Sequence, residues 1–164
     1  AGSVAPRRVP GFGFLQGRYI SAVGDTAAWT KRSAERPNVL AQEVRGLQPG
    51  RLYSLRFFTG NYQDYLAGKS NPYRHAVRAV LTGVQLVPEK RVQVQIKSNY
   101  GHIYGPFNRD NPYRMNYHQQ VFRALAPTAK LTLSDWQSAT EPGGPAGEEL
   151  IWNFIQLQPY IPED

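Results

Sequence analysis

The stretch Arg91-Val-Gln-Val-Gln-Ile-Lys97 alternates apolar and polar side chains without interruption. A period of two residues is typical of a β-strand, because successive side chains of a strand point to opposite faces. We expect Val92, Val94 and Ile96 to face a hydrophobic core and the alternate polar residues to face water. The stretch therefore predicts a strand of an antiparallel sheet with one wet face.

Other segments have the same strand character and lie between turn signals rich in Gly and Pro. Strands are expected over 51–58, 75–87, 130–134 and 150–158, with shorter ones over 38–44 and 118–123. Gly83 is expected to bend the strand over 75–87, and residues 26–35 (TAAWTKRSAE) favour a short helix instead. About seven or eight short strands predict an all-β fold, an antiparallel β-sandwich, with a closed barrel as the alternative.

The phase of these strands predicts which side chains form the core. The strands over 91–97 and 150–158 are expected in the centre of their sheets. The expected core consists of Tyr53, Leu55, Phe57, Val77, Ala79, Val92, Val94, Ile96, Leu131, Leu133, Ile151, Ile155 and Leu157.

Length and composition limit the classes of protein. The chain has 164 residues, of which 41% are hydrophobic and 19% charged, so we expect one domain over 1–164, with 1–10 as a flexible N-terminal segment. No apolar run approaches the roughly 18 residues of a membrane span, so no membrane insertion is expected. The net charge is +7, and the basic residues occur singly or in pairs along the sequence. This positive charge is compatible with nucleic acid, anionic polysaccharide or a membrane surface as partner.

Two segments are too long for ordinary hairpin loops, 61–74 and 98–117, and such loops often carry function. Both contain Asn-Pro-Tyr-Arg, at 71–74 and 111–114, and seven of the ten tyrosines fall between positions 62 and 117. Sugar rings stack on aromatic side chains, while their hydroxyls need polar partners. We therefore expect these segments to form one ligand surface, with Arg74 and Arg114 as hydrogen-bond donors. The candidate binding residues are Tyr62, Asp64, Tyr65, Tyr73, Arg74, Tyr100, His102, Tyr104, Asn108, Arg109, Tyr113, Arg114 and Trp136.

Three stretches resemble the galactose-binding-like superfamily of carbohydrate-binding modules. They are Val39-Leu-Ala-Gln-Glu-Val-Arg-Gly-Leu-Gln-Pro-Gly-Arg-Leu-Tyr-Ser-Leu55, Ala129-Lys-Leu-Thr-Leu-Ser134 and the C-terminal strand over 151–157. The resemblance implies a jelly-roll β-sandwich. Such modules often hold a structural calcium, but here the start of the chain departs from their pattern and Asn153 stands where they carry an aspartate.

The resemblance also implies a function. It is non-catalytic recognition of a polysaccharide, acidic if the arginines take part, by a secreted or cell-surface module covalently linked to a glycan-degrading enzyme. No cofactor is expected, and no catalytic motif occurs: the three histidines are far apart in sequence and no cysteine is present. The alternatives are a single-stranded nucleic-acid-binding domain, a structural or adhesion domain, and a small polysaccharide-degrading enzyme.

Overall fold

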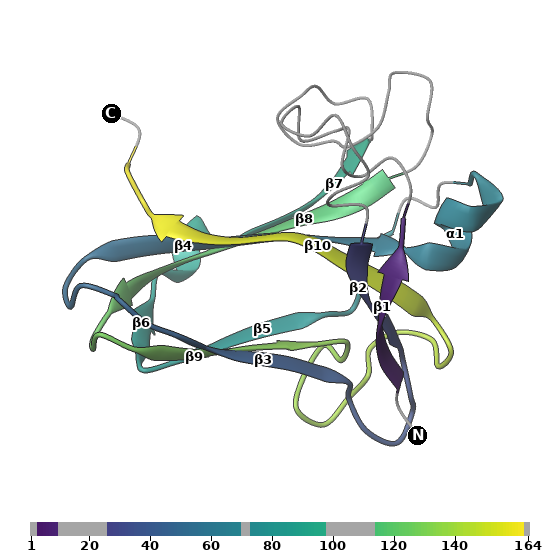
Figure 1. Cartoon of the computed structure of the whole chain (residues 1–164), viewed down its shortest axis with the longest axis horizontal. Coiled ribbons are helices and arrows are strands. Elements are labelled where there is room, and N and C mark those ends of the chain that lie inside the picture. Colours follow the sequence, from purple (N-terminus) through teal and green to yellow (C-terminus); the bar gives the residue numbers. More distant parts are fainter. Residues whose placement is uncertain (1–2, 10–25, 70–72, 98–113, 163–164) are drawn as a thin grey trace.

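The computed structural model describes residues 3–9, 26–69, 73–97 and 114–162, and these form two antiparallel β-sheets (Figure 1). The larger sheet contains β1 (Ser3–Arg8), β2 (Thr26–Lys31), β10 (Glu149–Pro159), β4 (Leu52–Asn61) and β8 (Arg114–Ala124), in that order, with β6 (Val84–Leu86) and β7 (Val92–Lys97) both pairing with β8. The smaller sheet contains β3 (Val39–Val44), β9 (Ala129–Ser134) and β5 (Arg78–Thr82). Two short helices complete the elements, α1 (Tyr62–Ala67) and the 3₁₀ turn η2 (Pro88–Lys90). The expectation of an all-β fold of two antiparallel sheets is confirmed.

The main core lies between the two sheets. Its buried members are Leu47, Tyr53, Leu55, Phe57, Val77, Leu81, Phe122, Ala124, Ala129, Leu131, Leu133, Leu150 and Trp152. The alternation of β4 and β9 explains this set, because Tyr53, Leu55 and Phe57 of β4 face Leu131 and Leu133 of β9. The expected core positions on these two strands are therefore correct, and Ala79 and Leu157 pack against the same cluster.

A second cluster covers part of the outer face of the larger sheet. Its buried members are Val9, Ala27, Trp29, Phe58, Met115, Tyr117 and Ile151, with Val92, Tyr62 and Tyr65 packed against them. The position of this cluster shows that the expected phase of the strand over 91–97, with Val92 facing the main core, is wrong for Val92. Val92 packs on the outer cluster, whereas Gln93 turns inward and donates a hydrogen bond from Nε2 to the backbone oxygen of His75, 3.1 Å away. The side chains of Val94 and Ile96 lie outside the described part of the chain.

β10 is a central strand, as expected, but its phase changes along its length. Asn153 pairs with Phe58 and Gln156 with Arg56, so one extra residue is inserted between them as a β-bulge. Phe154 there has a positive φ of 52°, an unusual conformation for a residue with a side chain. The bulge turns Ile155 out of the core to 44% exposure, so the expectation that Ile155 is buried is wrong.

Three further expectations differ from the structure. Residues 26–31 form β2 rather than a helix, because pairing with both β1 and β10 satisfies the backbone and buries Trp29. Residues 3–8 form β1, paired along its whole length with β2, where we expected a flexible segment. Within the described residues, β7 pairs with β8 alone and is not a central strand. In contrast, Gly83 does mark a bend, with a φ of +80° between β5 and β6.

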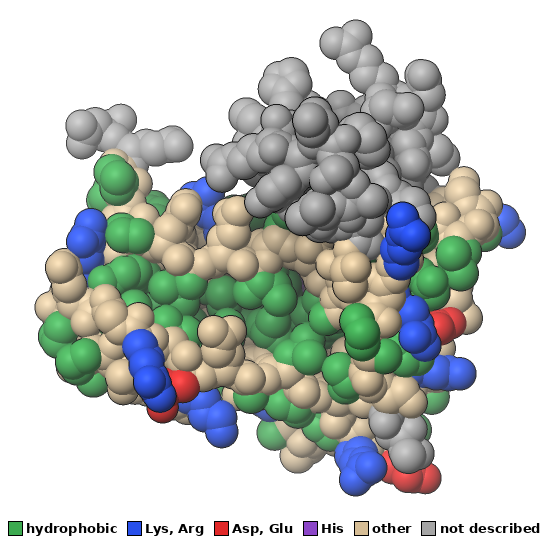
Figure 2. Space-filling model, viewed as in Figure 1, with side chains coloured by type: hydrophobic (Ala, Val, Ile, Leu, Met, Phe, Trp, Pro, Cys, Tyr) green, Lys and Arg blue, Asp and Glu red, His purple; other side chains and the backbone are tan. Residues whose placement is uncertain are grey.

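One side of the fold is open between the sheets. Figure 2 shows hydrophobic side chains gathered in a hollow between β10 and β3. Leu40 and Val44 of β3 and Leu157 of β10 are partly buried against the main core. No helix in the described residues has the length and apolarity to cross a bilayer.

Candidate functional site

The two long segments singled out by sequence start from the same end of the larger sheet. Gly60, at the end of β4, pairs with Met115, at the beginning of β8. Lys97, at the end of β7, pairs with Arg114. The chain therefore leaves β4 and β7 and enters β8 at neighbouring positions, the end at which α1 lies in Figure 1.

The segment after β4 begins with a helix rather than a loop. Asn61 caps it, since its Oδ1 accepts a hydrogen bond from the backbone nitrogen of Asp64 at 2.9 Å, and Gly68 ends it in the left-handed conformation. Helical spacing brings Tyr62 and Tyr65 together, with ring centroids 6.3 Å apart and planes inclined by 18°. Both rings are half-buried against the outer cluster, so α1 presents two fixed aromatic side chains beside the half-buried Asp64.

Tyr73 belongs to a polar network. Its hydroxyl donates to Glu148 Oε2 at 2.8 Å and accepts from Asn61 Nδ2 at 2.7 Å. Burial raises the pKa of this hydroxyl, and the adjacent Glu148 carboxylate raises it further. Tyr73 therefore links the chain at 73–74 to the start of α1 and to Glu148, and the hydroxyl proton of Tyr73 is used in doing so.

Glu148 is held in turn by Arg32, which is 2% exposed. Arg32 Nη1 lies 2.5 Å from Glu148 Oε1. The same guanidinium donates to the backbone oxygens of Asp135 at 2.7 Å, Ala76 at 2.9 Å and Pro145 at 3.3 Å. One buried side chain thus joins four separate parts of the chain.

Two histidines meet on the inner face of the larger sheet. His75 Nδ1 and His118 Nε2 each lie 2.8 Å from the hydroxyl oxygen of Thr59, and the hydroxyl can donate its proton to only one of them. Burial lowers the pKa of His75 to about 4, and burial together with the neighbouring His75 lowers the pKa of His118 to about 3. Both rings are therefore neutral at physiological pH. His118 also stacks on Phe57 with centroids 4.5 Å apart.

The remaining candidate residues fall into three groups. Arg74 is exposed beside Tyr73. Trp136 is buried, and its Nε1 donates to the backbone oxygen of Ser33 at 2.9 Å, so it packs inside the fold rather than facing a ligand. Arg114 begins β8, with its side chain outside the described part of the chain, as are Tyr100, His102, Tyr104, Asn108, Arg109 and Tyr113 in their entirety.

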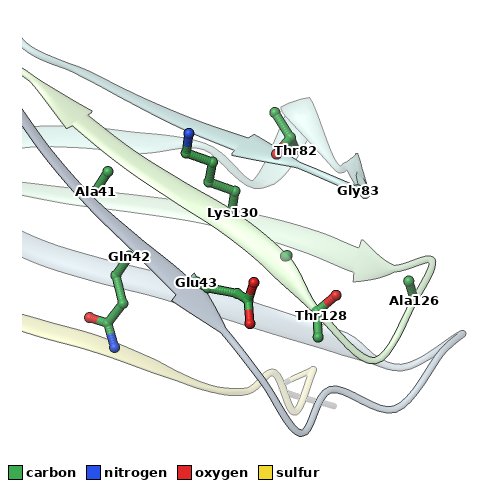
Figure 3. A pocket seen from close by; sticks show the side chains of 9 residues that line it. Ala41, Gln42, Glu43, Thr82, Gly83, Ala126, Thr128 and Lys130 are labelled. Atoms are coloured by element: carbon green, nitrogen blue, oxygen red, sulfur yellow. The ribbon is translucent and has the colours of Figure 1, made fainter.

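A shallow groove of about 640 Å³ lies elsewhere, on the smaller sheet (Figure 3). Its lining residues come from β3, β5, β9 and the 126–129 turn, and are mostly small or short: Ala41, Gln42, Glu43, Thr82, Gly83, Ala126, Thr128, Ala129 and Lys130. Among the residues that the structure describes, no aromatic ring and no candidate binding residue lines it. The groove therefore lacks the stacking surface that sugar rings use.

The described residues contain no set of metal ligands: no group of three His, Asp or Glu side chains among them could hold a metal ion. Asn153, the position compared with a calcium-ligating aspartate, already accepts a hydrogen bond on Oδ1 from the Phe154 backbone.

The sequence analysis did not identify the buried pair of Arg32 and Glu148 or the two histidines as interacting groups. The alternation of β8 could have predicted the position of His118, because His118 follows the outward-facing Tyr117 and therefore faces inward.

In comparisons with known proteins, no family model matches the chain and no curated protein is significantly similar to it.

Proposed function

We propose that the chain is a non-catalytic carbohydrate-binding module that recognises a polysaccharide with the end of the larger sheet beside α1. The observation that carries the proposal is that the strands from which the two tyrosine-rich segments start end side by side, through the pairing of Gly60 with Met115 and of Lys97 with Arg114. A rigid sheet that presents several long connections at one end is a common arrangement for ligand recognition.

The described part of this surface has the chemistry that a sugar requires. Tyr62 and Tyr65 offer half-buried rings held by packing, so little rotamer entropy is lost when a pyranose stacks on them. Asp64 and the exposed Arg74 supply an acceptor and a donor for hydroxyl groups. The other candidate residues of 98–117 remain predictions for the same surface.

In this proposal the polar network belongs to the scaffold that carries the binding surface. The two buried carboxylates of the described chain are both engaged in the scaffold: Glu148 pairs with Arg32, and Asp135 accepts two hydrogen bonds from Asn38. In this proposal the network holds the segment around Tyr73 rigid.

The proposed context is a jelly-roll module, secreted or on the cell surface, linked to an enzyme that degrades the bound polysaccharide. Tethering would raise the effective concentration of the enzyme on its substrate without any new catalytic contact.

The test is a glycan array followed by calorimetry on the best ligand with Tyr65→Ala. Loss of one stacking ring should weaken binding about ten- to a hundredfold, by analogy with aromatic platforms that stack nucleic-acid bases. Leu66→Ala is the matched control, because Leu66 lies on the same helix and is 65% exposed. Equal losses in both variants would refute the site. Binding to single-stranded DNA with a steep salt dependence, and to no glycan, would refute the function.

A further inference from the structure

A row of polar side chains crosses the outer face of the larger sheet beyond the outer cluster. Gln156 of β10 pairs with Arg56 of β4, which pairs with Gln119 of β8. The inward neighbours Leu55 and Phe57 belong to the main core, so the three side chains of the row point outward. Gln156 is exposed, and Arg56 and Gln119 are half-buried.

The guanidinium of Arg56 is held in place by hydrogen bonds. Its Nε donates to Gln119 Oε1 at 3.1 Å. The same oxygen accepts from the Tyr117 hydroxyl at 3.1 Å, and Gln119 Nε2 donates to the backbone oxygen of Lys90 at 3.3 Å. Among the described residues, no hydrogen-bond partner is found for the two Nη groups of Arg56. These groups form the planar fork that binds a carboxylate or sulfate in two parallel hydrogen bonds.

The surroundings of the row favour an anion. The outward positions around it are Ser54, Phe58, Val92, Tyr117, Val121 and Gln158, none of which carries a negative charge. Beyond Ser54 and Val121, Lys90 Nζ lies 3.1 Å from the hydroxyl oxygen of Tyr160 and 5.1 Å from the centre of its ring. At the other end the rings of Phe58 and Tyr117 pack 5.3 Å apart in the cluster that also holds Tyr62 and Tyr65.

We propose that Gln156, Arg56 and Gln119 form a subsite for the carboxylate of a uronic-acid residue in an acidic polysaccharide. The inference rests on the proposed function and deepens it. The aromatic side chains of α1 stack on sugar rings of any charge, while Arg56 selects chains that carry a carboxylate. Gln156, whose exposed amide both donates and accepts, binds hydroxyl groups of that sugar, while Gln119 holds the guanidinium in place and keeps one N–H of Nε2 as a donor.

The experiment compares uronic-acid hexasaccharides with their carboxyl-reduced, neutral counterparts by calorimetry. Wild-type protein should bind the acidic form about tenfold more tightly, the size of a charge-assisted bidentate contact of about 1.4 kcal/mol. Arg56→Gln should abolish this preference and leave affinity for the neutral form unchanged. Arg56→Lys, which keeps the positive charge but lacks the planar guanidinium, should retain only part of the preference for the acidic form. Arg45→Gln is the control, because Arg45 is an exposed arginine of the 45–51 turn region.

The outcomes separate the two proposals. If neutral and acidic chains bind wild-type protein equally, or if Arg56→Gln keeps the preference, the subsite is refuted and the module function stands. If neither form of any chain binds, both proposals are refuted. A twelve-nucleotide oligothymidylate that binds in place of every oligosaccharide and loses affinity in Arg56→Gln would assign the row to nucleic acid and refute the uronate subsite.

Discussion

Replacing Arg32 with methionine should destabilise the fold far more than the same replacement at the exposed Arg45. The change removes a buried charge opposite Glu148 and the donors to the backbone oxygens of Asp135, Ala76 and Pro145. Methionine fills a similar volume, so the loss is mainly electrostatic. The Glu148 carboxylate would remain buried with only the Tyr73 hydroxyl as a partner.

The magnitude follows from the geometry. Removing one partner of a buried ion pair costs about 3–5 kcal/mol of unfolding free energy, because the other charge stays uncompensated. In a chain of this length each kcal/mol lowers the melting temperature by about 2–4 °C, so we expect a decrease of about 6–20 °C. Tyr73→Phe, which removes one hydroxyl from the same network, should cost about 1–3 kcal/mol.

Urea denaturation followed by tryptophan fluorescence measures these losses. The matched control is Arg45→Met, because Arg45 also pairs with a glutamate, Glu43, at 2.5 Å, but with its side chain 81% exposed. An exposed pair contributes less than about 1 kcal/mol, so this variant should behave like wild-type protein. If Arg32→Met and Arg45→Met had equal midpoints, the network would not stabilise the fold, and the argument that it holds the segment around Tyr73 would fail.

Two other predictions concern acid and backbone strain. Stability should fall as the pH decreases from about 6.5 towards 4.5, because the unfolded chain takes up protons on His75 and His118 that the folded chain, with pKa values of about 4 and about 3, does not bind. Each histidine contributes up to about 1.4 kcal/mol per pH unit, and unfolding free energies of His118→Gln measured across this range should show a shallower slope; an unchanged slope would contradict the assignment. Gly83→Ala should cost about 1–2 kcal/mol, because φ is +80° at the bend, a conformation that residues with a Cβ rarely adopt. A melting temperature equal to that of wild-type protein would show that the bend tolerates a side chain.

Sequence patterns predicted the fold correctly where local features alone, such as side-chain alternation or a glycine at a bend, determined the structure. Alternation along 51–58 and 130–134 placed the core side chains of β4 and β9 correctly, and Gly83 marked a real bend. The prediction failed where longer-range pairing competed with local preference. The alanines of 26–31 favour a helix, but two neighbouring strands fix them as β2. The bulge at Phe154 reverses the phase of β10 within an otherwise regular pattern, so Ile155 was misplaced.

The candidate site was predictable in part. Long, tyrosine-rich segments between strands indicated a surface, and the structure shows that they start from one end of the sheet. The contacts that each candidate side chain makes were not predictable from the sequence. Tyr73 and Trp136 look like ligand-binding aromatics in sequence, yet their polar atoms bind Glu148 and the backbone of Ser33. Arg32 and Glu148 lie 116 positions apart, so no local pattern links them.

The most direct test of glycan recognition at this end of the sheet is amide chemical-shift mapping on ¹⁵N-labelled protein with the best oligosaccharide from the array. The proposal predicts the largest shifts at α1, at Tyr73 and Arg74, and along the outward positions of β4 and β8 near Arg56 and Gln119. Shifts confined to the groove of β3, β5 and β9, or no shifts with any oligosaccharide at saturating concentration, would contradict it.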